Sequence, residues 1–185
     1  MKFNKKMMQN KYLAHKNHLE YKYLPEIVFG GIDGSVTTFA VVSGVVGASL
    51  SSSIVLILGF ANLIADGFSM ATSDYFSTKT RNEQGTSRQK PTKTAFATFL
   101  AFLVIGLIPL LPFITAFITK SSYVIENQFL YSAIITGLAL VIVGSLKGII
   151  TGKHPVKSAV ETFIIGSVAA ALAFVAGYLL SILVS

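Results

Sequence analysis

The sequence predicts an all-α polytopic membrane protein with five transmembrane helices, its N-terminus in the cytoplasm and its C-terminus outside the cell or in a lumen. Of its 185 residues, 52% are hydrophobic and 12% are charged, which is too apolar for a typical soluble domain. The apolar residues gather into five runs, each long enough to cross a hydrocarbon core about 30 Å thick. All but one of the 15 Lys and Arg residues fall on one side of such a chain.

The chain divides into a basic N-terminal segment and a membrane domain. Residues 1–24 are polar and rich in lysine, and they are expected to form a cytoplasmic amphipathic helix. This segment lacks the apolar core of a cleavable signal peptide, so we expect it to be retained. Residues 25–185 are expected to form the five-helix membrane domain.

The spans are expected in order at 27–49, 53–76, 95–119, 129–149 and 159–184. The connections between them, at 50–52, 77–94, 120–128 and 150–158, are too short for a soluble domain. Pro109 and Pro112 lie inside the third span, where proline kinks a helix, whereas Pro155 is expected in a loop.

Basic residues set the predicted orientation. They precede the first span, fill the connection between the second and third spans, and surround the turn between the fourth and fifth, so only Lys120 falls on the opposite side. The positive-inside rule then places the N-terminus in the cytoplasm. Because this topology explains the net charge of +7, no nucleic-acid partner is expected. The chain has no cysteine, which excludes disulfides and thiolate metal sites.

Three carboxylates lie within or at the mouth of the first two spans. From a rise of about 1.5 Å per residue, Asp33 lies roughly 9 Å inside the cytoplasmic boundary, at the depth of Met70. Asp66 lies roughly 15 Å deep, and Asp74 lies near the cytoplasmic mouth. Carboxylates at membrane depth are costly and usually line a pathway or a buried site.

Helical periodicity places polar side chains on one face of the second span and small ones on one face of the first. The polar face includes Asn62, Asp66, Met70, Ser73 and Asp74, while the small face carries Asp33, Thr37, Ala40, Gly44 and Gly47. Small residues permit close approach of another helix, so this second face predicts a helix pair or a homodimer interface that contains Asp33.

Carboxylate oxygens bind divalent cations, and a thioether adds a softer ligand that Ca²⁺ and Mg²⁺ do not seek. An Asp and Met site therefore favours a first-row transition metal such as Fe²⁺. Because empty buried carboxylates have a raised proton affinity, they could exchange protons for metal, which outlines an antiport mechanism.

Two motifs resemble the vacuolar iron transporter family. They are residues 29–48, FGGIDGSVTTFAVVSGVVGA, and residues 57–71, ILGFANLIADGFSMA. The resemblance implies a dimeric five-helix transporter that moves Fe²⁺, and sometimes Mn²⁺, out of the cytosol in exchange for protons. It also implies that Asp33 and Met70 line the pathway at the dimer interface. The metal is then a substrate, and no cofactor is expected.

The chain departs from the family in two places. Many members follow Ser-Met-Ala with Gly-Glu-Tyr, whereas Asp74 precedes the tyrosine here. Eukaryotic members insert a Glu-rich metal-binding domain between the second and third spans, where this chain has only 77–94, with Glu83 as the sole acid. The resemblance therefore leaves the choice between Fe²⁺ and Mn²⁺ open.

Each candidate residue also has a structural interpretation. Asp33 could cap a helix start, Asp66 could be a hydrogen-bond partner inside the bundle, and Asp74 could be a solvated surface acid. Glu161 is expected to pair with Lys157 or to favour the helix dipole. Lys147 is expected to snorkel to the interface.

The predicted function is a homodimeric antiporter that exports Fe²⁺ or Mn²⁺ from the cytoplasm for metal homeostasis. Its ligands are Asp33 and Met70, with Asp66 as the inner carboxylate and proton exchanger, Asp74 at the mouth, and Asn62, Thr37 and Ser73 along the pathway. The expected location is the plasma membrane, or the vacuolar membrane in a eukaryote. A non-transporting scaffold and a metal-dependent membrane transferase are the alternatives, although no catalytic constellation favours an enzyme.

Overall fold

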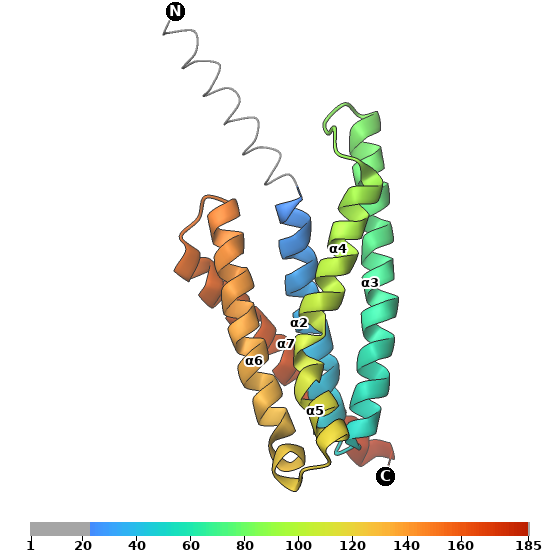
Figure 1. Cartoon of the computed structure of the whole chain (residues 1–185), viewed down its shortest axis with the longest axis vertical. Helices are drawn as coiled ribbons and strands as arrows, with labels where there is room; N and C mark the ends of the chain where they lie inside the picture. The colour runs from blue at the N-terminus through green and yellow to red at the C-terminus, as the bar shows by residue number, and fades with distance from the viewer. Residues whose placement is uncertain (1–22, 185) are drawn as a thin grey trace, which may run out of the picture.

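Seven helical elements make up residues 23–184, the part of the chain that the computed structural model describes. They are α2 (Leu24–Gly47), α3 (Ser52–Glu83), α4 (Pro91–Gly106), the 3₁₀ turn η1 (Ile108–Leu110), α5 (Leu111–Thr119), α6 (Ser122–Ile150) and α7 (Pro155–Val184). With α4 to α5 taken together, they form five spans long and apolar enough to cross a membrane, side by side in one bundle (Figure 1). The predicted all-α fold with five spans is confirmed, and the orientation of the two termini stays a prediction. The expected amphipathic helix at 1–24 lies almost wholly outside the described residues.

All five spans begin before their predicted first residue, and α3 and α6 extend furthest beyond their predicted bounds. The helix α3 continues past residue 76 to Glu83, and α6 begins at Ser122 rather than at 129. The extension of α3 is packed as well as hydrogen-bonded, because the fully buried Thr78 accepts hydrogen bonds from Thr94 at 3.2 Å and from Arg81 at 3.1 Å. Hydropathy marks where a chain leaves the bilayer, whereas tertiary contacts decide where its helix ends.

Proline positions explain the interruption in the third span. The predicted kink is the three-residue turn η1, which contains Pro109, and Pro112 lies in the first turn of α5. A helix start tolerates proline because its first N–H groups have no partner within the helix. For the same reason Pro155, which was expected in a loop, is the first residue of α7.

Each connection between spans contains one residue in the left-handed region. These residues are Ser49, Gly85, Lys120 and Gly152, with φ values of 57°, 73°, 51° and 65°. A left-handed residue just after a helix ends it and turns the chain back, and glycine adopts that conformation without strain. Successive spans are therefore antiparallel and their connections are short.

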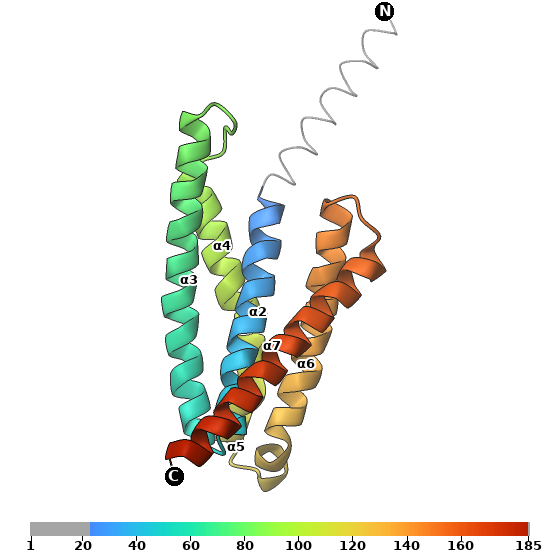
Figure 2. The ribbon, with the colours of Figure 1, turned by 180° about the vertical axis from the view of Figure 1, so that it is seen from behind.

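The helix α2 lies at the centre of the bundle, where it packs against α3, α4, α6 and α7. Gly30 and Gly34 touch the backbone of α4 at Thr98 and Phe102. Farther along, Gly44 and Gly47 touch the backbone of α7 at Ala173 and Phe174, where α7 crosses the side of the bundle that faces the viewer in Figure 2. The small face of α2 thus forms a helix pair with α7 of the same chain.

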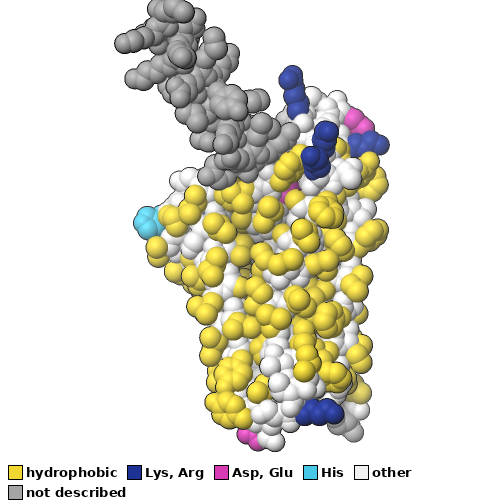
Figure 3. Space-filling view, viewed as in Figure 1, with side chains coloured by type: hydrophobic (Ala, Val, Ile, Leu, Met, Phe, Trp, Pro, Cys, Tyr) yellow, Lys and Arg dark blue, Asp and Glu magenta, His cyan; other side chains and the backbone are white. Residues whose placement is uncertain are grey.

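The surface of the bundle is largely apolar. Hydrophobic side chains cover most of the face shown in Figure 3, as expected for helices surrounded by lipid. Apart from Lys120, the described Lys and Arg residues lie in or next to the α3–α4 and α6–α7 connections, at the end of the bundle where α2 begins. We call this the basic end.

Candidate metal site

Asp33 lies in the interior of α2, half-buried, between two glycine contacts with α4. Because α2 runs without a break from Leu24 to Gly47, Asp33 does not cap a helix start. Thr37, a predicted pathway residue, donates its hydroxyl to the backbone carbonyl of Asp33 at 2.8 Å. That hydroxyl is used within the helix, which leaves the Asp33 carboxylate as the polar group free to meet a cation.

The Asp33 and Asp66 carboxyls lie close enough to interact electrostatically, although they come from different helices. Asp66 is exposed on the outer side of α3 and accepts no hydrogen bond from a described residue, so it is not a structural partner inside this single chain. Two neighbouring carboxylates repel each other unless a cation or a proton lies between them. A cation or a proton bound near both carboxylates would reduce this repulsion.

The residues of the predicted polar face of α3 differ in how far they are buried against the rest of the bundle. Ser73 is exposed, while Asn62 is half-buried with a buried side-chain Nδ2 that has no hydrogen-bond partner among the described residues. Met70 is partly buried and packs against the hydrophobic core around Phe102 and Leu63. This face thus combines the packed Met70 with a buried amide of Asn62 that has no partner within residues 23–184.

Asp74 is half-buried and accepts a hydrogen bond at 2.8 Å from the hydroxyl of Thr98, a fully buried residue of α4. It is therefore not a fully solvated surface acid. The bond ties α3 to α4 and fixes the orientation of a carboxylate at the basic end of the bundle.

We expect Thr98→Val to lower the stability of the bundle by about 0.5–2 kcal/mol, because valine keeps the shape but leaves the Asp74 carboxylate without its donor. Thermal unfolding in detergent measures the effect. Thr98→Ser keeps the hydroxyl and serves as the control. An equal loss in both variants would mean that the methyl group matters and the hydrogen bond does not.

Glu26 is a site residue that the sequence reasoning missed. It is 8% exposed, its Oε2 has no hydrogen-bond partner among the described residues, and it lies within electrostatic range of Asp74 and Arg81. The signal was available, since Glu26 precedes Asp33 by seven residues and so shares its face of α2, about 10 Å away along the axis. It was overlooked because the first span was predicted to begin one residue later.

Together these carboxylates form two steps along α2 and α3. Glu26 and Asp74 lie at the basic end, and Asp33 with Asp66 lies deeper. Within residues 23–184, no three His, Asp or Glu side chains converge on one point as in a closed metal centre. The arrangement suits a path along which a cation passes from one pair of carboxylates to the next.

Comparison with known proteins was consistent with the two motifs. The sequence profile of the VIT family matches residues 24–87 and 81–178. A vacuolar iron transporter of Toxoplasma gondii is 29% identical over 88% of this chain and 76% of its own length. Vacuolar iron transporter homolog 4 of Arabidopsis thaliana is 33% identical over 83% of this chain and 81% of its own, and vacuolar iron transporter 1 of rice is 26% identical over 87% and 88%.

The alignments also show where this chain and the Toxoplasma relative differ in length. The alignment with the Toxoplasma protein spans 230 positions, more than the 185 residues of this chain, so the relative carries extra residues within the matched region. The two parts of the profile match meet at residues 81–87, at the end of α3 and the start of the α3–α4 connection. This is the connection that the sequence singled out as short.

Proposed function

The chain belongs to the VIT family of membrane transporters, and from that premise we propose that it exports Fe²⁺, with Mn²⁺ as a second substrate, from the cytoplasm in exchange for protons. The protein is a multi-pass membrane metal transporter and not an enzyme, and the metal is its substrate. The observation that carries the proposal is the two-step arrangement of carboxylates along α2 and α3.

The proposed path begins at the basic end, which the positive-inside rule assigns to the cytoplasm. Glu26 and Asp74 attract the hydrated cation at the mouth, and Asp33 with Met70 forms the central site. Asn62, Thr37 and Ser73 line the path. A carboxylate and a thioether together favour a first-row transition metal over Ca²⁺ or Mg²⁺.

Proton coupling follows from the same groups. A carboxylate that releases a metal inside a low-dielectric path is more stable when it takes up a proton. Asp66 is the proposed proton exchanger, since it lies within electrostatic range of Asp33 and accepts no hydrogen bond from any residue of 23–184. Export against a metal gradient then uses the inward proton gradient.

We propose that the transporter is a homodimer that joins along α3. Asp66 is exposed on this chain, on the same face of α3 as the exposed residues Ser69 and Ser73. A carboxylate facing lipid at this depth is costly, so a second copy that covers this face would turn Asp66 into a residue of an internal pathway. The proposed location is the plasma membrane, or the vacuolar membrane if the cell is eukaryotic.

Uptake into proteoliposomes that enclose a pH-sensitive dye tests the function. We expect Fe²⁺ to enter with protons moving the opposite way, and Mn²⁺ to enter more slowly. Metal movement without a pH change would reject antiport, and no metal movement by folded protein would favour the scaffold alternative.

The variant Met70→Leu tests the ligand set in the same vesicles. Leucine conserves the volume and apolar character of methionine but lacks its sulfur, so we expect the Fe²⁺ rate to fall about tenfold and the preference for Fe²⁺ over Mn²⁺ to shrink. Phe68→Leu, which changes an exposed residue of the same helix, is the control. Equal rates in Met70→Leu and wild type would remove Met70 from the site.

A further inference from the structure

A cavity of about 360 Å³ lies between α2 and α6 near the basic end. Asp33 and Lys147 both line it, and the rest of its wall is formed by Pro25, Val28, Phe29, Ile32, Ile150 and Thr151. The Lys147 side chain and the proposed metal ligand therefore line one space with mostly apolar walls. Such walls strengthen electrostatic interactions relative to water.

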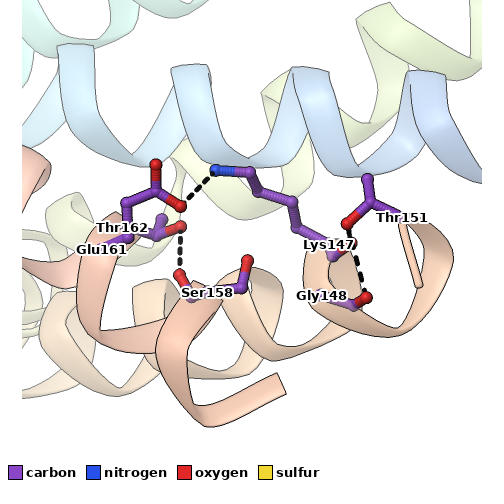
Figure 4. A network of polar contacts seen from close by, with 6 residues as sticks. All are labelled: Lys147, Gly148, Thr151, Ser158, Glu161 and Thr162. Atoms are coloured by element: carbon purple, nitrogen blue, oxygen red, sulfur yellow. Dashed lines mark hydrogen bonds and ion pairs between the residues drawn. The ribbon is translucent and has the colours of Figure 1, made fainter. Parts of the chain in front are cut away.

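The Lys147 ammonium is bound to a carboxylate other than Asp33. Its Nζ lies 3.3 Å from Oε2 of Glu161 on α7, and Figure 4 shows the lysine side chain extended alongside α2 toward that carboxylate. From the sequence, Glu161 was expected to pair with Lys157 or to favour the helix dipole, and Lys147 to snorkel to the interface, whereas the structure pairs Glu161 with Lys147.

The backbone holds the two helices at a fixed spacing around this pair. Gly144 and Gly148 lie on either side of Lys147, and a Cβ atom at these positions would come within 2.9 Å of the Cα of Ala159 and 2.8 Å of the Cα of Pro155. Thr151 also donates its hydroxyl to the carbonyl of Lys147 at 2.8 Å. The position of Glu161 relative to Lys147 is thus set by close helix contact.

If Glu161 lost its charge, the carboxylate of Asp33, which lines the same cavity as Lys147, would be an alternative partner for the lysine. A lysine side chain is a flexible four-carbon stem with a point charge at its end, so it can turn from one carboxylate to another. An ammonium paired with Asp33 would compete with a divalent cation for the same oxygens. The side chains of Lys147 and Glu161 are 30% and 53% exposed, so neither is locked in place by burial.

We propose that Glu161 is a positioning residue that holds the Lys147 ammonium away from Asp33 and thereby keeps this carboxylate available to the metal. The inference rests on the proposed function, in which Asp33 is a metal ligand. It assigns the Lys147 and Glu161 pair a role in metal affinity beyond joining α6 to α7.

Fe²⁺ uptake kinetics in proteoliposomes test the inference. We expect Glu161→Gln to raise the KM for Fe²⁺ about tenfold, with a maximal rate and thermal unfolding close to wild type. The double variant Lys147→Met with Glu161→Gln should return the KM to the wild-type value, because the competing ammonium is gone. A purely structural ion pair would give no such rescue.

Lys157 provides the matched control. It lies four residues before Glu161 on α7 and does not line the cavity, so Lys157→Met combined with Glu161→Gln should keep the raised KM. An unchanged KM in Glu161→Gln, or a raised KM that Lys147→Met fails to reverse, overturns this inference alone. Absence of Fe²⁺ uptake by the wild type overturns the proposed function and this inference with it.

Discussion

Asp33→Asn is expected to abolish metal transport, lowering the initial Fe²⁺ rate by at least about 100-fold toward that of empty vesicles. Asparagine has nearly the same shape as aspartate, so the contacts of Gly30 and Gly34 with α4 are kept and the helix stays in place. What disappears is the negative charge that offsets the loss of hydration when a divalent cation enters an apolar cavity. Initial rates in proteoliposomes measure the loss.

Glu83→Gln is the control for Asp33→Asn, because it removes one negative charge from the exposed tip of α3, outside the proposed path. It should transport at the wild-type rate. Both variants must match the wild type in thermal unfolding and in elution from a size-exclusion column. If folded Asp33→Asn still moved Fe²⁺ with opposite proton movement, Asp33 would not be a ligand and the central site would have to lie elsewhere.

Gly34→Ala is expected to cause the largest loss of stability of the substitutions considered. The added Cβ atom would lie 2.5 Å from the carbonyl oxygen and 3.0 Å from the Cα of Phe102, so α2 and α4 would have to separate. Overpacking of this kind costs about 1–3 kcal/mol, which should lower the unfolding temperature in detergent by roughly 2–12 °C. Because Asp33 is the preceding residue, transport should fall as well.

Gly137→Ala separates packing from the general effect of replacing glycine in a helix. Its Cβ atom would meet the Phe163 ring at 3.1 Å, and a side chain can move where a backbone cannot. We expect its unfolding temperature to equal or slightly exceed that of the wild type, since alanine favours helix. Similar losses in both glycine variants would show that close approach of α2 to α4 is not what Gly34 provides.

The residues of the site were predicted to different depths of detail. A polar residue inside an apolar run can be recognised from the sequence alone. This is how the sequence identified Asp33, Asp66, Met70 and Asp74. Glu26 was not, because it borders the polar N-terminal segment and is buried beside residues of α3 and of the α3–α4 connection. Its burial depends on helices that are distant in sequence.

The sequence also could not predict which helix or side chain each of these residues contacts. Helical periodicity put Gly44 and Gly47 on one face, but it left open whether a second copy or another helix covers that face, and the structure places α7 of the same chain there. Likewise, spacing favoured Lys157 as the partner of Glu161, whereas α6 brings Lys147 to it. A helix fixes which residues share a face, and packing decides what that face meets.

The sequence by itself determined the five spans, their antiparallel order and the intramembrane carboxylates, because the cost of placing a residue in lipid is a local property that adds up along a helix. Only the tertiary structure decided that α3 extends to Glu83, that Thr98 holds Asp74, and that Lys147 shares a cavity with Asp33. These features depend on the rotation and spacing of helices about one another, which close glycine contacts set between residues far apart in the chain.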